Sequence, residues 1–357
     1  MLILGIETSC DDASAAVVEN GHKLLGMATA SQIDAHRAYG GVVPEIAARE
    51  HVGSIIGVVD QALASAAIKL NNVDAIAVTS GPGLIGSLMI GVQTAKSLSL
   101  GLRIPIQPVH HVVGHVYANF ITESKIKLSN TLPHGQPQFP MLALVVSGGH
   151  TQMMLFDSHL KFKIVGRTCD DAIGEAFDKT AKILNLPYPG GVSVSEQAIL
   201  GDRDAYKLPK PKTENILDTS FSGLKTALLR EAQKTAGGDF TMPSFEIASH
   251  LNQKQVNDFC ASFEDAALDY VVDKMRLAYL KFKPKSVVIG GGVAGSQRLR
   301  TKLSLSLGID IEYAPAELCV DNGAMIAAAG YQAHKLKKPI DANEIRIEPN
   351  KKVFIGV

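Results

Sequence analysis

The sequence predicts a two-lobed α/β protein that contains one folding unit twice. Three observations support this fold class: short apolar strands run into glycine-rich loops, helical stretches separate those strands, and residues 143–166 repeat the pattern of residues 3–26. The chain has 357 residues, whereas a single hydrophobic core stops growing at about 250–300 residues. We therefore expect two packed domains.

Four short apolar segments end directly in small residues, and we expect each to be a buried strand. Short apolar runs suit a sheet that is covered on both faces, and a glycine loop lets a ligand approach the backbone. The segments are LILGIETS, AIAVTSGPG, LALVVSGGHT and SVVIGGGVAGS. The stretches with helical spacing are 45–70, 85–101, 172–186, 245–282 and 296–307. This alternation is typical of α/β proteins.

The internal repeat indicates how the two lobes are built. Residues 3–26 and 143–166 both read as strand, polar loop, strand, turn and strand, and AIAVTSGPGLIGS has a counterpart in SVVIGGGVAGSQ. Duplicated units that open with a hairpin are the pattern of the actin-like (ASKHA, ribonuclease H-like) fold, which has a nucleotide cleft between its lobes. The predicted division is residues 1–121 with 325–357, then a linker at 122–138, then residues 139–324 with an insert near 187–245.

Each glycine loop, taken alone, fits a tight turn as well as an anion site made of backbone amides. Four such loops together favour a bound nucleotide. The chain has no G-x-x-x-x-G-K-[ST] loop, but GPGLIG (81–86) and GGGVAG (290–295) both match the dinucleotide pattern G-x-G-x-x-G. Only the second is followed by acids at a suitable distance, Asp310 and Glu312. A dinucleotide site stays open as an alternative, although the duplicated hairpins disfavour it.

The composition limits the partners and the compartment. The 35 Lys and Arg residues balance 35 Asp and Glu residues, which excludes a uniformly basic coat for nucleic acid. A basic face would have to be local, and the run 274–302 has eight basic residues and no acid. The four cysteines form no C-x-x-C pair, which indicates reduced thiols of an intracellular protein. Because MLILGIETSC lacks a basic region and an uninterrupted apolar stretch, we expect no targeting segment. We also expect no membrane span, because Gly81, Pro82 and Gly83 break the uncharged run 75–95.

Two histidines form a candidate metal site. His111 and His115 are four residues apart in PVHHVVGH, which places both imidazoles on one face of a predicted helix. A metalloprotease of the H-E-x-x-H type needs Glu at position 112, and Val112 removes that base. Two half-exposed histidines without a metal fit the spacing equally well. Asp321 in CVDNGAMIAAAG is the best candidate for a third ligand, although it also fits the N-cap of the following helix.

Carboxylates cluster at two further places. Asp11 and Asp12 follow the first strand, and DDAIGEAFDKTAKIL carries Asp171, Glu175 and Asp178 on one helix face. The helix dipole explains acids at the amino end of this helix. Asp178 lies later, and it fits either a ribose contact or a solvated helix face.

Taken together, these motifs resemble the TsaD family, the tRNA N6-adenosine threonylcarbamoyltransferases once labelled O-sialoglycoprotein endopeptidases. The resemblance runs almost from end to end. It rests on GIETSCDD, YGGVVPEIAAREH, TSGPGLIGSL, PVHHVVGH, LVVSGGHTQ, DDAIGEAFDKTAKIL, YPGG, SFSGLKTAL and VDNGAMIA. The opening ETSCDD resembles the bacterial and mitochondrial branch more than the archaeal one.

The resemblance implies an enzyme that transfers the threonylcarbamoyl group from threonylcarbamoyl-AMP to adenosine 37 of tRNAs reading ANN codons and releases AMP. It implies one divalent metal ion, Fe2+ or Zn2+, held by His111, His115 and Asp321. The substrate contacts that it implies are Val145, Val146, Ser147, Gly148, Gly149, Asp178 and Gly191. The chain departs from the family pattern at Ser296, where Asn is common, and at Val192, where Pro is frequent. We expect Ser296 and Ser195 to offer the contacts there.

The adenylate is already activated, so the enzyme needs chiefly to orient the amine and to stabilise charge on oxygen atoms. We expect no Ser/His/Asp or Cys/His nucleophile, and we predict that Asp11 or Asp12 assists removal of the amine proton. The expected partners are tRNA and either TsaB- and TsaE-like proteins, in a bacterium, or a second copy of the chain, in a mitochondrion. The expected location is correspondingly the cytoplasm or the mitochondrial matrix. An ATP-dependent small-molecule kinase and a nucleotide-gated chaperone-like module are the rival interpretations.

Overall fold

Both sheets implied by the repeat are present in the computed structural model, which describes residues 1–336 and 339–352. The strand order is β5-β4-β1-β2-β3-β6 in the first sheet and β10-β7-β8-β9 in the second. The first sheet contains β1 (Leu2–Glu7), β2 (Ala13–Glu19), β3 (Lys23–Ala30), β4 (Ala75–Gly81), β5 (Ile106–His110) and β6 (Glu123–Ser124). The second contains β7 (Met141–Val146), β8 (Thr151–Ser158), β9 (Lys161–Arg167) and β10 (Ser286–Gly290).

The two sheets share one unit, an antiparallel three-stranded meander with a parallel strand beside its first strand. In the first sheet, Gly5 pairs with Ala16 on antiparallel β2 and with Ala77 on parallel β4. In the second, β7 pairs in the same way with antiparallel β8 and with parallel β10. The predicted internal repeat is therefore confirmed, and all four predicted strands are in place.

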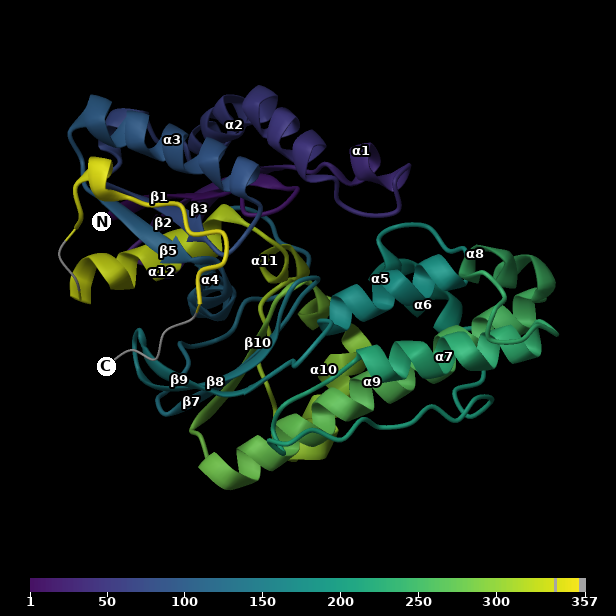
Figure 1. Ribbon diagram of the computed structural model, residues 1–357. Helices are drawn as coiled ribbons and strands as arrows, with labels where there is room; N and C mark the ends of the chain where they lie inside the picture. The colour runs from purple at the N-terminus through teal and green to yellow at the C-terminus, as the bar shows by residue number, and fades with distance from the viewer. Residues whose placement is uncertain (337–338, 353–357) are drawn as a thin grey trace.

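Helices cover both faces of the first sheet (Figure 1). Helices α2 (Pro44–Ala66) and α3 (Ile85–Leu102) lie on one face, and α4 (His111–Tyr117) and α12 (Gly323–Leu336) lie on the other. A Cβ atom added to Gly5 would lie 2.0 Å from the carbonyl oxygen of Gly323, so α12 meets β1 at backbone distance. This close approach fixes the start of α12, and hence the segment just before it, against the first sheet.

The helices of the second lobe gather beside the second sheet, on the right in Figure 1. They are α5 (Ile173–Ile183), α6 (Gly190–Ala198), α7 (Ser222–Thr235), α8 (Ser244–Ile247), α9 (Gln253–Phe282) and α10 (Gln297–Leu307). The predicted insert near 187–245 thus contains α6 and α7 as well as an irregular segment. Its helical pattern is weak in the sequence because α7 has a narrow apolar face, made by Leu224, Leu228 and Ala232.

Short elements complete the chain. They are α1 (Ile33–Arg37), α11 (Ala316–Cys319) and the 3-10 turns Leu70–Asn72, Ala118–Phe120, Ala248–His250, Gly292–Gly295 and Ala342–Glu344. Strand β6 falls inside the predicted linker 122–138 and pairs with β3. The predicted lobe boundaries remain a prediction. Within the part of the chain that the structure describes, no helix is long and apolar enough to cross a membrane.

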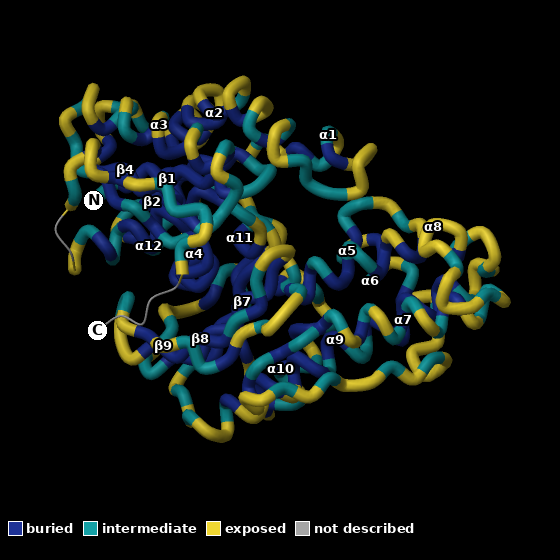
Figure 2. Tube along the Cα trace, viewed as in Figure 1, coloured by how far each residue is buried: buried dark blue, intermediate teal, exposed yellow. Residues whose placement is uncertain are grey.

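The main hydrophobic core runs through the junction of the lobes (Figure 2). It joins the α4 and α12 side of the first sheet to the second sheet, while a separate core lies under α2 and α3. Tyr117 and Phe120 stack at its centre with ring centroids 4.9 Å apart, and both are buried. Because close-packed interiors deform little, side chains presented by α4 are held in fixed positions.

Candidate metal and nucleotide site

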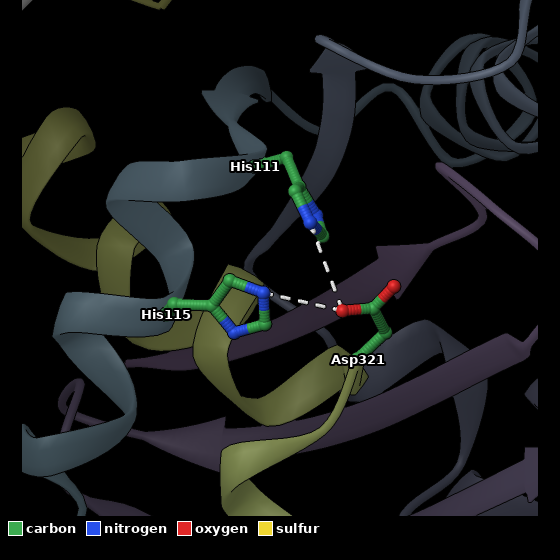
Figure 3. Close-up of side chains that lie close together, drawn as sticks. All are labelled: His111, His115 and Asp321. Carbon is green, nitrogen blue, oxygen red and sulfur yellow. Dashed lines mark ion pairs between the residues drawn. The ribbon is translucent and has the colours of Figure 1, made fainter. Parts of the chain in front are cut away.

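Helix α4 presents His111 and His115 toward Asp321, which precedes α12 (Figure 3). The Nε2 atoms of His111 and His115 lie 3.6 Å and 3.2 Å from Asp321 Oδ1. One ligand atom from each of the three residues lies within 4.8 Å of the others. Both histidines are buried, and 23% of the Asp321 side chain is exposed. The three residues predicted to be ligands therefore form one cluster.

Local geometry explains why the two histidines point together. Helix α4 starts directly where β5 ends, so its first residues are fixed by the sheet, and the four-residue spacing puts both rings on one face. Gly114 lies between them, and a Cβ atom there would be 2.8 Å from Ile326 Cδ1 of α12. The glycine lets α4 approach the helix whose preceding loop carries Asp321.

The N-cap interpretation of Asp321 is wrong, because Asn322 caps the helix. The Asn322 Oδ1 atom accepts a hydrogen bond of 2.8 Å from the backbone amide of Met325. The Asn322 amide group also donates to the carbonyl oxygen of Val320 at 2.7 Å. The Asp321 carboxylate is therefore not used by the helix, and it faces the histidines instead.

A buried carboxylate orients His111 from behind. Glu7, at the end of β1, is fully buried, and its Oε2 atom lies 3.2 Å from His111 Nδ1. The same Oε2 atom accepts a hydrogen bond from Thr79 Oγ1, and Oε1 accepts one from the Ser9 amide, both at 2.5 Å. A ring whose Nδ1–H donates to a carboxylate presents Nε2 to a cation. Glu7 was not among the residues predicted from the sequence, although a lone acid inside an apolar strand was a signal for it.

The protonation states of His111 and Asp321 depend on each other. Burial favours the neutral ring of His111, but the charges of Asp321 and Glu7 outweigh it and raise the His111 pKa to about 9. Burial likewise opposes ionisation of Asp321, but the neighbouring His111 and His115 hold its pKa well below the usual range. A cation bound by these three residues would take the place of the His111 proton.

The donor set fits a divalent cation. Both ring nitrogens of His115 are buried and have no hydrogen-bond partner among the described residues. The 3.2 Å contact of its Nε2 atom with Asp321 is not aligned as a hydrogen bond. An unsatisfied buried polar group costs roughly 1–3 kcal/mol, which a metal bond to Nε2 would offset. Two imidazoles and one carboxylate are a common ligand set for catalytic metals with open positions.

The loop between β1 and β2 brings two more acids to the cluster. Burial, together with the charges of Asp11 and Asp321, raises the pKa of Asp12 to about 6. The Oδ1 atom of Asp12 is buried and lacks a hydrogen-bond partner within the described residues. Asp12 therefore carries an unused acceptor close to the candidate metal ligands.

The glycine loop that follows β7 lies beside the same cluster. Its backbone turns sharply, since the Ser147 amide donates to the His150 carbonyl oxygen at 2.8 Å, and the Gly174 amide of α5 donates to Ser147 O at 3.2 Å. Val145 and Val146 are buried in the strand, whereas Gly148 and Gly149 are exposed. The ring centroid of His150, the next residue, lies 5.9 Å from that of His111. His150 was not among the residues predicted from the sequence.

Asp178 and Gly191 lie on the second-lobe side. The Asp178 Oδ1 atom accepts a 2.8 Å hydrogen bond from the Gly190 amide at the start of α6. Burial, together with the charges of Glu175 and Asp11, raises the Asp178 pKa to about 6. Gly191 has open space where a side chain would project.

The two serines predicted as substrate contacts already have internal partners. Ser195 Oγ donates to Glu264 Oε1 at 2.7 Å. Ser296 Oγ accepts from the Leu299 amide at 3.3 Å and caps α10. Their hydroxyl groups have structural roles, and a substrate contact by either remains a prediction.

The basic run 274–302 does not form one surface. Lys274 is buried and donates to the carbonyl oxygen of Ile216, and Arg300 is buried against Ala314. Arg298 and Lys302 form ion pairs with Asp265 of α9. The exposed remainder, near the carboxyl end of α9, consists of Arg276, Lys281, Lys283 and Lys285.

Comparison with solved structures bears on the fold. Component A of (R)-2-hydroxyglutaryl-CoA dehydratase from Acidaminococcus fermentans has a TM-score of 0.51 at 16% identity, over 94% of this chain and 99% of that one. Full-length HypF has a TM-score of 0.56 at 14% identity, over 95% of this chain and 56% of its own. At such low identity these likenesses show the fold alone. Together with the duplicated sheets, they confirm the predicted actin-like fold class.

Comparison with sequences bears on the family. The model of the TsaD family, tRNA N6-adenosine threonylcarbamoyltransferase, matches residues 23–328. A protein of that name from Symbiobacterium thermophilum is 43% identical over 349 residues, which are 96% of this chain and 95% of the relative. Another from Bacillus subtilis is 42% identical over 337 residues, 92% of this chain and 90% of the relative. The chain therefore belongs to the TsaD family, the tRNA N6-adenosine threonylcarbamoyltransferases.

Proposed function

We propose that this protein transfers the threonylcarbamoyl group from threonylcarbamoyl-AMP to N6 of adenosine 37 in tRNAs reading ANN codons. Membership of the TsaD family supports the activity. The structural observation that carries the proposal is the buried cluster of His111, His115 and Asp321 beside the glycine loop. An acyl-adenylate has both a phosphate group and a reactive carbonyl group, so a cation site next to a phosphate-binding loop suits its reaction.

The reaction makes one bond and breaks one. The N6 amine attacks the carbamoyl carbon and forms a C–N bond, and the bond from that carbon to the phosphate oxygen breaks. AMP leaves with the electron pair, and the amine proton passes to a base. The protein therefore has to orient two substrates and stabilise charge on oxygen, and it needs no nucleophile of its own.

The adenylate is proposed to lie across the junction of the lobes. Backbone amides of Gly148 and Gly149 hold its phosphate together with the Ser147 hydroxyl group, since the Ser147 amide already donates to His150 O. Val145 and Val146 fix the loop as the end of a buried strand. Asp178 and Gly191 contact the nucleoside. One oxygen of Asp178 is taken by the Gly190 amide, which leaves the other for a ribose hydroxyl.

The proposed metal ligands are His111, His115 and Asp321. A divalent cation held there would polarise an oxygen of the adenylate, and the two imidazoles and the carboxylate suit Fe2+ and Zn2+ alike. Glu7 keeps the His111 Nδ1 proton in place, so that Nε2 faces the site.

Asp12 is the better of the two candidates for the proton acceptor. Its buried Oδ1 atom has no donor in the described part of the chain, so it can take a proton without breaking an existing contact. A pKa of about 6 leaves the carboxylate mostly ionised at neutral pH, in the range that suits general base catalysis. Asp11 then acts through its charge, which raises the Asp12 pKa.

We propose tRNA as the acceptor, TsaB- and TsaE-like proteins as partners, and the bacterial cytoplasm as the location. The relatives described above, both called tRNA N6-adenosine threonylcarbamoyltransferase, come from bacteria, which supports this proposal. The decisive experiment incubates the protein with unmodified tRNA, threonine, bicarbonate, ATP and an adenylate-forming enzyme, with and without the partners. We expect threonylcarbamoyl-adenosine in the digested tRNA and equimolar AMP.

Each rival predicts a different product. A small-molecule kinase would form ADP only when its own substrate is added, and a chaperone-like module would hydrolyse ATP slowly without changing tRNA. Absence of the modified nucleoside under every combination of partners would refute the proposed transfer. Full activity of both Asp11→Ala and Asp12→Ala would refute the assignment of the base alone.

A further inference from the structure

A polar pocket of about 760 Å³ opens in the second lobe next to the glycine loop. Three segments line it: residues 149–152 at the start of β8, residues 167–169 after β9, and parts of the irregular segment 212–220. Of the lining residues, only Gly149 belongs to the proposed adenylate site, and none is a proposed metal ligand. The pocket is large enough for a nucleotide.

The pocket reaches the proposed reaction centre through the glycine loop. Gly149 lines the pocket and belongs to the loop proposed to hold the adenylate phosphate. His150 also lines it, and the His150 ring centroid is 5.9 Å from that of the candidate metal ligand His111. A molecule bound in the pocket would therefore lie beside the adenylate, which is where the acceptor has to be.

The charges in the pocket suit a phosphate backbone. Arg167 and Lys212 line it, and neither forms an ion pair with any described residue. The nearby Asp218 carboxylate is engaged, because its Oδ1 atom accepts from the Arg167 backbone amide at 2.9 Å and from Asn215 Nδ2 at 3.1 Å. Glu214 is the remaining acid of the lining. Within the described chain, Arg167 and Lys212 are thus two unpaired cations beside two carboxylates, Glu214 and Asp218, and Asp218 already accepts from neutral N–H donors.

The uncharged lining offers hydrogen bonds. The hydroxyl groups of Thr151, Thr168, Thr213 and Ser220 already bond within the protein, but each oxygen can accept one more hydrogen bond. The lining has no Phe, Tyr or Trp ring among the described residues. Such a surface is suited to ribose hydroxyls and phosphates, because base stacking would need aromatic rings.

We propose that this pocket docks the ribose–phosphate backbone of the anticodon-loop segment that carries the acceptor adenosine, with Arg167 and Lys212 contacting its phosphates. The inference rests on the proposed function, since only a tRNA substrate gives the pocket this occupant. Single-stranded loops are the part of a tRNA whose backbone and bases can enter such a pocket.

The first test measures tRNA affinity as a function of salt for the wild-type protein and for Arg167→Ala/Lys212→Ala, each with the same partner proteins. Removing one phosphate-binding side chain from a single-strand site reduces the slope of log affinity against log salt by about 0.7, so the slope of the double variant should fall by about 1.4. Lys210→Ala is the matched control: Lys210 is also exposed, but it is paired with Asp273 at 2.5 Å and lies outside the lining. Its slope should equal that of the wild type.

The second test uses wild-type protein and needs no substitution. Cys169 lines the pocket and is exposed, whereas Cys260 and Cys319 are buried. We expect unmodified tRNA to slow alkylation of Cys169 by iodoacetamide, as measured by mass spectrometry of the Cys169 peptide. A tRNA that lacks its anticodon stem-loop, at the same concentration, is the control and should leave Cys169 unprotected.

The outcomes separate this inference from the proposed function. A wild-type protein that modifies tRNA, together with an unchanged salt slope in the double variant and unprotected Cys169, would show that the acceptor binds elsewhere. A reduced slope and protection of Cys169 support the pocket. If the wild-type protein makes no modified nucleoside, the proposed function fails, while the footprint still decides whether the pocket binds RNA. Thermal unfolding of each variant checks that these exposed substitutions leave the fold intact.

Discussion

The Glu7 carboxylate, at the end of the first strand, lies 3.2 Å from Nδ1 of His111, at the start of α4. This contact joins two segments far apart in the sequence. Together with the Ser9 hydroxyl group, which lies 3.0 Å from the same Nδ1 atom, it leaves Nε2 of the His111 ring to face Asp321. Glu7 also accepts hydrogen bonds from Thr79 and from the Ser9 amide, so the carboxylate is held rigidly. The orientation of a candidate metal ligand thus depends on a residue that would not itself touch the metal.

Replacing Glu7 with Gln should weaken metal binding. A glutamine cannot accept all three hydrogen bonds, because its amide group would have to face a donor. Removal of such a partner typically lowers metal affinity by about 10- to 100-fold. The measurement is competition calorimetry with Zn2+ on protein stripped with a chelator. Glu45→Gln, an exposed substitution on α2, should bind like the wild type, and equal affinities for all three proteins would refute the role of Glu7.

Removing His115 should abolish stabilisation by metal. A ligand present at a hundred times its Kd stabilises the folded state by about 2.7 kcal/mol, and this gain should vanish in His115→Ala. His110→Ala is the matched control, because its Nε2 atom lies near the Lys351 carbonyl oxygen and it is not part of the cluster. Differential scanning calorimetry with and without Zn2+ measures this stabilisation. Retained stabilisation in His115→Ala would exclude it as a ligand.

Asp178→Asn should stabilise the protein at neutral pH. Burial raises the Asp178 pKa from 3.8 to about 6, so the folded state binds this proton more tightly than the unfolded state does. Ionisation of the carboxylate therefore lowers the free energy of unfolding as pH rises from about 4 to 6. Above pH 6 the loss is roughly 3 kcal/mol, because each pKa unit corresponds to about 1.36 kcal/mol. Asn can still accept from the Gly190 amide. Urea unfolding at pH 7.5 and 4.5 should show a gain that shrinks at the lower pH.

Asp171→Asn, just before the same helix, should do the opposite. Burial of Asp171 is outweighed by hydrogen bonds from Lys179 and Lys225, which lower its pKa. Its carboxylate thus contributes stability that is present above its unfolded pKa and disappears as pH falls through the lower folded value. The same urea experiment should show destabilisation at pH 7.5. Shifts of the same sign in both variants would contradict the assignment of these charges.

Two substitutions of Ser296 should separate its two possible roles. Ser296→Ala removes the N-cap of α10 and should cost about 1 kcal/mol of unfolding free energy. Ser296→Asn keeps a good cap and restores the longer amide that is common in the family. We expect stability close to the wild type and a lower KM for the adenylate. An unchanged KM would show that position 296 serves only the helix.

Local patterns determined most of the fold. The four apolar segments that end in glycine loops are β1, β4, β7 and β10, and the repeat between 3–26 and 143–166 reappears as two equivalent meanders. These features were predictable because strand and helix periodicity depend on neighbouring residues alone. The helices of the insert were harder to predict, because their short apolar faces depend on packing against α5 and α9.

The sequence by itself determined the family, the fold class and the face of α4 on which His111 and His115 lie. Only the tertiary structure decided that Asp321 joins them, since Asn322 caps α12 and the close approach of Gly5 and Gly323 sets α12 against the first sheet. The tertiary structure likewise placed Glu7 behind His111. It also engaged four of the eight basic residues of 274–302 in contacts within the protein, namely Lys274, Arg298, Arg300 and Lys302. The physical reason is that hydrogen bonding and desolvation act on groups that are close in space, and spacing along the chain says little about which distant groups will meet.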